Sequence, residues 1–421
     1  MDFTSRSEAA SRWRDVYIAA AARAIAGCGN FTAVTALVLT LQPVSGYAVS
    51  ALILASTVPV VVLAPVAGRL ADRVDSRRLL VAVGASQVVI ALALAATGAL
   101  PAIIVLMALL GCGQAIINPT LAALTPSMVR RDDLPRASAT NQTAAMLGML
   151  TGPAIGGLLV GLYGLQVPLL LNAAALLAIV GAALLVQTRR GGSRSTPAGE
   201  PGAEPRSTTP QWRLWHDPLL RTVMIVIAGV LGVIGAMNVV EVFLIRETLG
   251  AAEVSFGLLQ AAWTAGMLLG TWLLARAARR ARDDGALVYG LLMTLGLVCA
   301  MFSLAAMVGG PAWLAPLWII GGLGNGGLNV YASVVVARRA PEQRRGQVYA
   351  TLGATLHGAA MAGYAGGGLL VEALPIRPLV AGLGLTGLIM VGLLTGPVIR
   401  TVRRERRSPA AVAGQGVSVP G

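Results

Sequence analysis

The chain has 421 residues, of which 56% are hydrophobic and only 12% are charged, a balance that excludes an ordinary soluble globular domain. The formal net charge is +14 and all 32 basic residues are arginine, but these arginines stand in short gaps between apolar runs, which argues against a nucleic-acid-binding surface. We therefore expect an all-α membrane protein.

Twelve apolar stretches have about the 20 residues that a helix needs to cross the hydrocarbon layer of a bilayer. The first is too long for the core of a signal peptide and is expected to remain as an anchor. Cys28, Cys112 and Cys299 all fall within apolar stretches and show no metal-ligand spacing, so they are expected to be packing residues. In chain order the predicted spans are 16–41, 48–67, 79–99, 102–124, 139–160, 167–185, 222–245, 254–275, 286–308, 313–337, 348–371 and 379–399.

The gaps between these spans alternate between arginine-rich and nearly uncharged. One side of the predicted membrane holds 29 of the 32 arginines, whereas the other holds only Arg246 and Arg377, and Arg23 lies inside the first span. Positive charge marks the cytoplasmic side of membrane proteins. The pattern therefore predicts an even number of crossings of the plasma (inner) membrane, with both termini in the cytoplasm.

A segment rich in Gly, Pro, Ser, Thr and Arg follows the sixth span and has no apolar period, which is typical of a flexible linker. Weak internal similarity supports two matched halves on either side of it: TGPAIGGLL from Thr151 is echoed by AGYAGGGLL from Ala362. The predicted organisation is a cytoplasmic N-tail (1–15), a six-helix bundle (16–188), a cytoplasmic linker (189–218), a second six-helix bundle (219–400) and a disordered tail (401–421).

The gap between the second and third spans, GRLADRVDSRR, resembles the signature loop of the major facilitator superfamily. The matching positions are Gly68, Asp72, Arg73, Arg77 and Arg78. Gly68 would permit a tight helix end, and Asp72 would face a helix N-terminus or an arginine, which would hold the cytoplasmic side shut. A generic positive-inside loop with one stray acid is the alternative.

One departure from the family pattern is Asp75, which stands where many members have a second glycine. It leaves the tightness of this turn open. The basic loop after the fourth span is assigned to the same predicted cytoplasmic gate and contributes Arg130, Arg131 and Arg136.

The fifth span contains GMLTGPAIGG, which resembles the glycine–proline motif of exporters in the same superfamily. Small residues four apart let a second helix approach closely, and proline removes a backbone hydrogen bond and kinks the helix. Tight packing alone is the alternative explanation, but the second half has Tyr364 at the proline position, so the halves differ there. The motif residues are Gly148, Gly152, Pro153, Gly156 and Gly157.

Over nearly its whole length the chain resembles the superfamily branch that includes the enterobactin exporter and macrolide efflux pumps. The resemblance rests also on Asn118 with Pro119 and on the loops RRDDLPRASATNQ and RRAPEQRRGQV. It implies twelve helices in two pseudo-symmetric bundles and efflux of a small organic molecule, such as a drug, siderophore or secondary metabolite, by proton antiport. It implies no cofactor and no metal, and a monomer in the lipid bilayer.

An ionisable group inside a membrane span costs about 2.5 to 3.5 kcal/mol on insertion scales, so its presence argues for a role or a partner. Glu241, near the outer end of the seventh span, is the leading candidate for a proton carrier, with an ion pair to Arg246 as the alternative. His357, in the eleventh span, is a second candidate, or a structural histidine between helices. Arg23 either reaches the cytoplasmic edge or contacts an anionic cargo.

In the family, the first, fourth, seventh and tenth spans line the central cavity. Amides on these spans either bind cargo or tie helices together. Many proton-coupled exporters carry an acid in the first span, where this chain has Asn30, so Glu241 must carry any coupling. Besides Arg23, the cargo-cavity candidates are Asn30, Gln114, Asn118, Asn238, Asn325 and Asn329.

Two other functions are alternatives to export. An importer or facilitator would share the fold, although the glycine–proline motif favours export. A polytopic membrane enzyme would need acids, histidines or cysteines clustered near one membrane face, and the sequence shows no such cluster, since His216 falls in the linker and His357 within a span. The predicted partners are therefore a small-molecule cargo, protons and lipid.

Overall fold

The computed structural model describes residues 11–188, 218–281, 283–339 and 345–407. The predicted linker (189–218), apart from its last residue, lies outside the described residues, as do most of the N-tail and the C-tail from residue 408. The side chain of Asp72 also lies outside the description.

Twelve long α-helices account for nearly all of the described residues, which contain no β-strand. Eleven of them are long and apolar enough to cross a bilayer, and the remaining one is α11, which is rich in glycine and alanine. The all-α, twelve-helix prediction is confirmed. The helices are α1 (Trp13–Leu41), α2 (Gly46–Arg73), α3 (Ser76–Ala96), α4 (Leu100–Met128), α5 (Leu134–Tyr163), α6 (Gln166–Leu185), α7 (Pro218–Phe243), α8 (Glu253–Arg280), α9 (Asp284–Ala305), α10 (Pro311–Arg339), α11 (Arg345–Ala373) and α12 (Ile376–Arg407).

Several helices extend beyond the apolar runs that predicted them. The expectation that Gly68 ends its helix is wrong, since α2 continues through it to Arg73. The turn into α3 consists of Val74 and Asp75, and neither has a positive φ. The Asp75 side chain accepts a hydrogen bond from the Arg78 backbone N–H at 3.0 Å, which satisfies one of the free donors at the start of α3. Aspartate is thus compatible with this turn.

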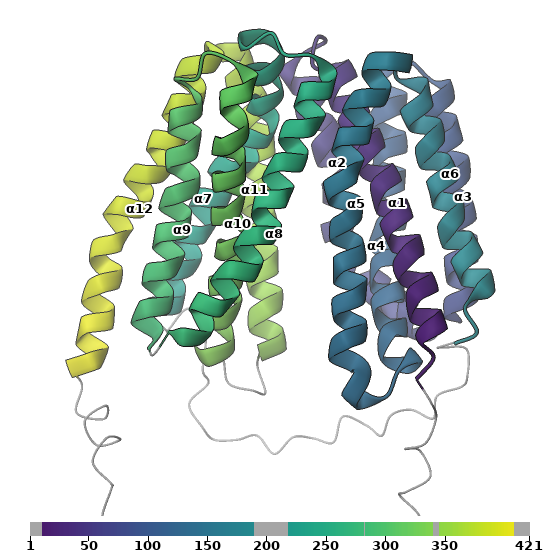
Figure 1. Ribbon diagram of the computed structural model, residues 1–421, viewed down its shortest axis with the longest axis horizontal. Coiled ribbons are helices and arrows are strands. Elements are labelled where there is room, and N and C mark those ends of the chain that lie inside the picture. Colours follow the sequence, from purple (N-terminus) through teal and green to yellow (C-terminus); the bar gives the residue numbers. More distant parts are fainter. Residues whose placement is uncertain (1–10, 189–217, 282, 340–344, 408–421) are drawn as a thin grey trace, which may run out of the picture. The chain divides into compact units, whose positions relative to one another are not determined.

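The chain divides into two compact units, each of which is described by itself. The first unit takes in residues 1–208 and also 245–261, so that it includes α1–α6, the π-helical turn η3 (Leu244–Thr248) from Ile245 onward, and the first turns of α8. Within it α1 packs against α5 and α6, α3 packs against α4 and α6, and α2 packs against α4. Figure 1 shows these six helices in purple to blue, with α1 next to α5 and α6.

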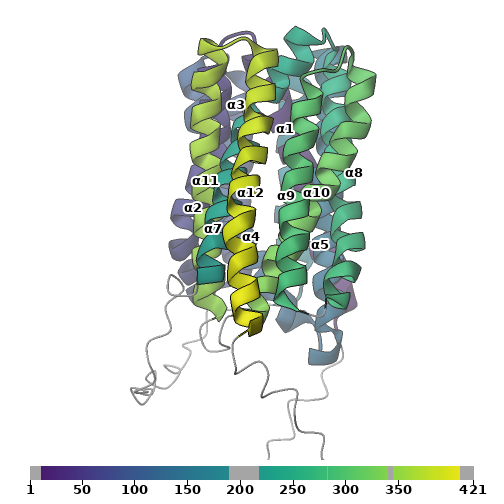
Figure 2. The same ribbon diagram turned by 90° about the vertical axis from the view of Figure 1, so that its left-hand side faces the viewer.

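The second unit, residues 209–244 and 262–421, repeats these pairings six helices further on. Helix α7 packs against α11 and α12, as α1 does against α5 and α6, and α9 packs against α10 and α12, as α3 does against α4 and α6. Figure 2 shows α9 and α12 side by side at the front of this unit. The weak sequence repeat therefore corresponds to a repeated bundle.

Glycines four residues apart let the paired helices approach to backbone contact. A Cβ added at Gly152 of α5 would lie 2.7 Å from the Cys28 carbonyl oxygen of α1, and one added at Gly363 of α11 would lie 2.1 Å from the Gly232 carbonyl oxygen of α7. Only glycine fits such a contact without movement of a helix. The two glycines occupy equivalent places in TGPAIGGLL and AGYAGGGLL. The Thr32 hydroxyl also donates to the Gly152 carbonyl at 3.0 Å.

A second face of α5, next to the one on α1, packs against the start of α8 within the first unit. A Cβ on Gly157 would lie 2.5 Å from the Glu253 carbonyl oxygen, and one on Gly257 would lie 2.3 Å from the Pro153 carbonyl oxygen. Gly161, one turn after Gly157, has more room, because the nearest atom to its added Cβ is a Val254 methyl at 3.7 Å. The glycine–proline motif therefore has two packing faces, with α1 on one and residues 253–257 on the other.

Polar contacts hold the segment before α8 in place. The Arg246 guanidinium donates to the Glu253 carboxylate and to the Ala251 carbonyl, both at 2.5 Å. Glu247 accepts a hydrogen bond from the Gln42 side-chain amide at the end of α1, also at 2.5 Å. Arg246, the alternative partner considered for Glu241, is therefore bound by Glu253.

The alternating arginine pattern predicts which loops face the cytoplasm. In a variant whose three cysteines are replaced by alanine, we expect Asp132→Cys, in the α4–α5 loop, to react with a membrane-impermeant maleimide only in inverted vesicles. Gly98→Cys, in the α3–α4 loop, should react only in intact spheroplasts. Both positions are exposed. Labelling of both from the same side would contradict the predicted topology.

The two glycines of α5 that face the start of α8 form a matched pair for substitution. We expect Gly157→Ala to lower the free energy of unfolding by about 1–3 kcal/mol, because the new methyl group would meet backbone. Gly161→Ala should leave stability unchanged or raise it by up to about 1 kcal/mol, since alanine favours the helix and has room there. Thermal unfolding of the purified variants in mild detergent measures both. Equal effects would show that α5 does not pack this closely.

Candidate functional site

A cluster of polar side chains lies between α7 and α11 in the second unit. Glu241 is in the last turn of α7, just before the π-helical turn η3, and only 6% of its surface is exposed. Tyr364 of α11 hydrogen-bonds the side chain of Asn238, one turn before Glu241, and is near enough to Glu241 for their charges to interact. A buried carboxyl group is thus gathered with a half-buried amide and phenol, and π-helical turns are frequent at functional sites.

The close packing of α11 on α7 positions Tyr364. Gly363 and Gly367, on either side of it in sequence, contact the backbone of α7 at Gly232 and Ala236. In the equivalent place on α5 stands Pro153, between Gly152 and Gly156. The tyrosine–proline difference is visible in the sequence, but Tyr364 is not among the predicted site residues. The aligned repeat was the signal that could have located it, because it puts Tyr364 on the glycine face of α11.

The second proton-coupling candidate is not part of this cluster. His357 is exposed on α11 and has no hydrogen-bond or ion-pair partner in the described part of the chain. Gly232 of α7 lies near Ala359, and α11 runs parallel to α7, so His357 is level with about residue 230, roughly eleven residues or 16 Å along the helix before Glu241. The structure thus separates the two candidates.

Four cargo-cavity candidates belong to the first unit. Arg23 and Asn30 of α1 and Gln114 of α4 are half-buried, and Asn118 of α4 is exposed. None of the four forms a hydrogen bond or ion pair within the described residues. These side chains are therefore available to a ligand.

The candidates on α10 are bonded mainly along their own helix. The Asn329 amide donates to the Asn325 carbonyl at 3.0 Å, and the Asn325 amide lies 3.9 Å from the sulfur of Met267 on α8. Ser333 in turn donates to the Asn329 carbonyl at 2.7 Å. The amide donors of both residues are partly engaged, whereas no described donor reaches their side-chain oxygens.

The predicted gate residues are distributed between two loops of the first unit. Arg73 and Arg78 are exposed, and Arg77 is half-buried at the start of α3. The loop after α4 is tied to the start of α1: the Arg136 guanidinium lies 4.7 Å above the Trp13 ring, a cation–π contact, and the Arg130 backbone N–H donates to Ser11 at 3.1 Å. Arg131 lies in the short helix η1 (Arg131–Asp133) of the same loop.

Asp15, the last residue of the predicted N-tail, lies in the first turn of α1 and is buried. Its carboxylate accepts hydrogen bonds from the Thr188 backbone N–H at 2.9 Å and from the Thr188 hydroxyl at 2.6 Å. The start of α1 is thereby fixed to the chain just after α6. An acid immediately before an apolar run is an ordinary helix-start signal, so its burial could not be foreseen.

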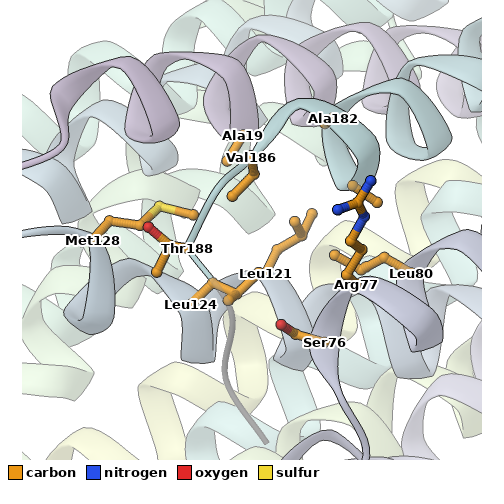
Figure 3. A pocket seen from close by; sticks show the side chains of 11 residues that line it. Ala19, Ser76, Arg77, Leu80, Leu121, Leu124, Met128, Ala182, Val186 and Thr188 are labelled. Atoms are coloured by element: carbon orange, nitrogen blue, oxygen red, sulfur yellow. The ribbon is translucent and has the colours of Figure 1, made fainter.

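Beside this contact, residues of α1, α3, α4 and α6 line a small, partly open cavity (Figure 3). Apolar side chains line most of it, among them Leu121 of α4 and Val186 after α6, and Arg77 stands at its edge. Ala19 of α1 and Leu121 of α4 both border this cavity. The Arg12 backbone N–H, just before α1, donates to the Met128 carbonyl of α4 at 2.8 Å. Ala19 and Leu121 each lie seven residues further into these antiparallel helices, so they are at about the same level.

Comparison with known proteins agrees with this architecture. The family model of the Major Facilitator Superfamily matches residues 19–282 and 232–419. An uncharacterised MFS-type transporter of Bacillus subtilis (strain 168), YfiS, is 25% identical over 409 residues, which cover 94% of this chain and 96% of that protein. Both matches extend over nearly the whole sequence.

Solved structures share the fold at low sequence identity. A bacterial homologue of the iron transporter ferroportin, in its inward-facing state, is similar with a TM-score of 0.70 and 16% identity over 93% of this chain and 99% of that one. A POT family transporter in complex with a thioalcohol-conjugated peptide gives a TM-score of 0.74 at 12% identity over 92% and 96% of the two chains. With the family model matched almost from end to end, the chain belongs to the Major Facilitator Superfamily and is a multi-pass membrane transporter, not an enzyme.

Proposed function

We propose that the protein exports a small amphipathic organic molecule in exchange for protons, by alternating access, and that it belongs to the branch of the enterobactin exporter and macrolide efflux pumps. In this proposal it works as a monomer in the plasma membrane with both termini in the cytoplasm. The observation that carries the proton part is the buried Glu241 beside Asn238 and Tyr364.

The position of Glu241 suits a group that gains and loses a proton. Every acid in the described helices lies within three residues of a helix end, and of those whose exposure is described only Asp15 and Glu241 are buried. Asp15 is bound by Thr188, at the arginine-rich end of α1. A buried carboxylate is costly unless polar groups stabilise it, so protonation of Glu241 changes the energy of the α7–α11 contact. Such a change can bias an equilibrium between two conformations.

The glycine–proline motif supports export as the direction. Its glycines pack against α1 on one face, and Pro153 and Gly157 pack against residues 253–257 on the other. Tight contacts on both faces make α5 sensitive to movement of either neighbour, because packed interfaces shift between discrete arrangements. The motif is the sequence feature on which the resemblance to exporters rests.

Proton coupling is tested in inverted vesicles with a panel of amphipathic dyes. We expect an imposed pH gradient to drive accumulation of at least one dye and nigericin to abolish it. Glu241→Gln should remove this gradient-driven accumulation, because glutamine keeps the size of the side chain but cannot exchange a proton. Glu372→Gln, at an exposed acid near the end of α11, is the matched control and should behave as wild type. Accumulation that survives nigericin or Glu241→Gln would refute the coupling.

The direction of transport is tested separately in a host that lacks its own efflux pumps. Expression of an exporter should lower the cell-associated fluorescence of a transported dye severalfold, whereas an importer or facilitator would raise it or leave it unchanged. The Gly157→Ala variant, at matched expression, should export less because its α5 contact is disturbed. Higher fluorescence in expressing cells would refute export.

A further inference from the structure

Arg23 is the most deeply placed charged residue in the described helices. It is the eleventh of the 29 residues of α1, about 15 Å along the helix from Trp13. Every other Arg, Asp or Glu in these helices lies within seven residues of a helix end. Arginines near helix ends can extend to the membrane surface, but Arg23 stands almost three turns inside. A charge at this depth requires a partner or a function.

Arg23 faces away from the most exposed side of α1. Asn30, seven residues on, lies on the same face, because seven residues make almost two full turns. Ile25, which is 49% exposed, lies on the opposite side about 200° round the helix. The neighbours Ala22 and Ala26 are buried in a core that includes Ile117 of α4. The half-buried guanidinium is thus on the same side of the helix as a second polar residue.

Helix α4 brings two more polar residues to this level. It runs antiparallel to α1, and Leu121 of α4 borders the same cavity as Ala19, one turn before Arg23 (Figure 3). Because the helices are antiparallel, one turn forward along α1, from Ala19 to Arg23, matches one turn back along α4. Ile117 and Asn118 are therefore level with Arg23. Gln114 follows one turn further on, toward the level of Asn30. All four polar side chains lack hydrogen bonds and ion pairs in the described part of the chain.

No acid of the described first unit is placed to neutralise Arg23. Helix α4 contains none, and Asp15, the one acid of α1, lies eight residues before Arg23 and is bound by Thr188. The remaining described acids of this unit stand at helix ends or in loops. A guanidinium presents five donors in a planar fork that matches a carboxylate, phosphate or sulfate.

We propose that Arg23, with Asn30, Gln114 and Asn118, forms a binding site for the anionic head of an amphipathic ligand, and hence that the cargo is an amphipathic anion. Asn118 and Gln114 supply side-chain amide donors near the level of the guanidinium, whereas the apolar body of the ligand is taken from the proposed function. That the bound anion is the transported cargo rests on the proposed export function. The binding site itself does not depend on proton coupling or on the direction of transport.

Binding of decyl sulfate to the purified protein in dodecyl maltoside tests the site. The probe keeps its charge at all working pH values, and 1-decanol and decyltrimethylammonium share its chain but are neutral and cationic. We expect the unfolding temperature to rise with decyl sulfate at concentrations at least tenfold below those at which the other two act. Equal effects of the three probes would overturn the proposal without any variant.

Substitutions locate the site. Arg23→Gln should weaken decyl sulfate binding at least tenfold, and Arg23→Lys severalfold, because lysine keeps the charge but not the fork. Asn118→Ala should weaken it by a smaller factor. Arg377→Gln, at an exposed arginine near the start of α12, is the control and should bind as wild type. Unchanged binding in Arg23→Gln, or in Arg23→Lys and Asn118→Ala together if Arg23→Gln does not fold, would refute the site.

The two proposals fail separately. Selective binding of decyl sulfate without gradient-driven dye transport would refute the export mechanism and leave the anion site standing. Gradient-driven transport with no preference for decyl sulfate over 1-decanol would refute the anion site and leave the export mechanism standing.

Discussion

Close approach of helix backbones is the interaction on which this structure depends. In lipid the helices already satisfy their own backbone hydrogen bonds, and no hydrophobic force draws one apolar helix to another, so packing of small residues must hold them together. Glycines of α5 supply this contact with α1, and glycines of α11 supply it with α7. Added methyl groups would meet carbonyl oxygens at these places. The spacing of glycine therefore decides which helices form pairs.

The glycine contact occurs in both halves, between α5 and α1 and between α11 and α7, but the residue between the glycines differs. Between the matching glycines, α5 has Pro153 and α11 has Tyr364. Proline lacks a backbone N–H and stands against Gly257 at the start of α8, whereas the tyrosine hydroxyl reaches Asn238 next to Glu241. One half thus has a glycine–proline helix that is packed on two faces, and the other has a polar cluster at the same place in its helix pair.

The two charged residues assigned to function in the described helices lie on different helices. Glu241 lies in the last turn of α7 among polar groups of its own unit, and Arg23 lies in the first half of α1 on a face without an acid. A proton and an anionic head would therefore bind to different helices. Exchange between them would require coupling through the conformation of the protein rather than competition for one residue.

Much of the architecture followed from local features of the sequence. Run length and arginine gaps predicted twelve helices because the hydrocarbon thickness sets helix length, and the glycine spacing marked α5 and α11 because spacing four places residues on one helix face. The loop motif was recognisable, but its glycine proved to lie inside α2, since Asp75 caps the next helix and the turn needs no glycine. Sequence also drew attention to Glu241 and Arg23, because charge is rare in membrane spans.

Tertiary structure decided which of these residues meet. Asp15 and Arg246 bind Thr188 and Glu253, and Glu241 lies near the hydrogen-bonded pair of Asn238 and Tyr364. Of these residues, the sequence repeat pointed only to Tyr364. The assignment of residues 245–261 to the first unit likewise follows from contacts with α1 and α5, not from position in the chain. Hydropathy fixes how often a chain crosses the bilayer, but the face that a helix turns to its neighbour depends on side-chain fit between segments more than a hundred residues apart.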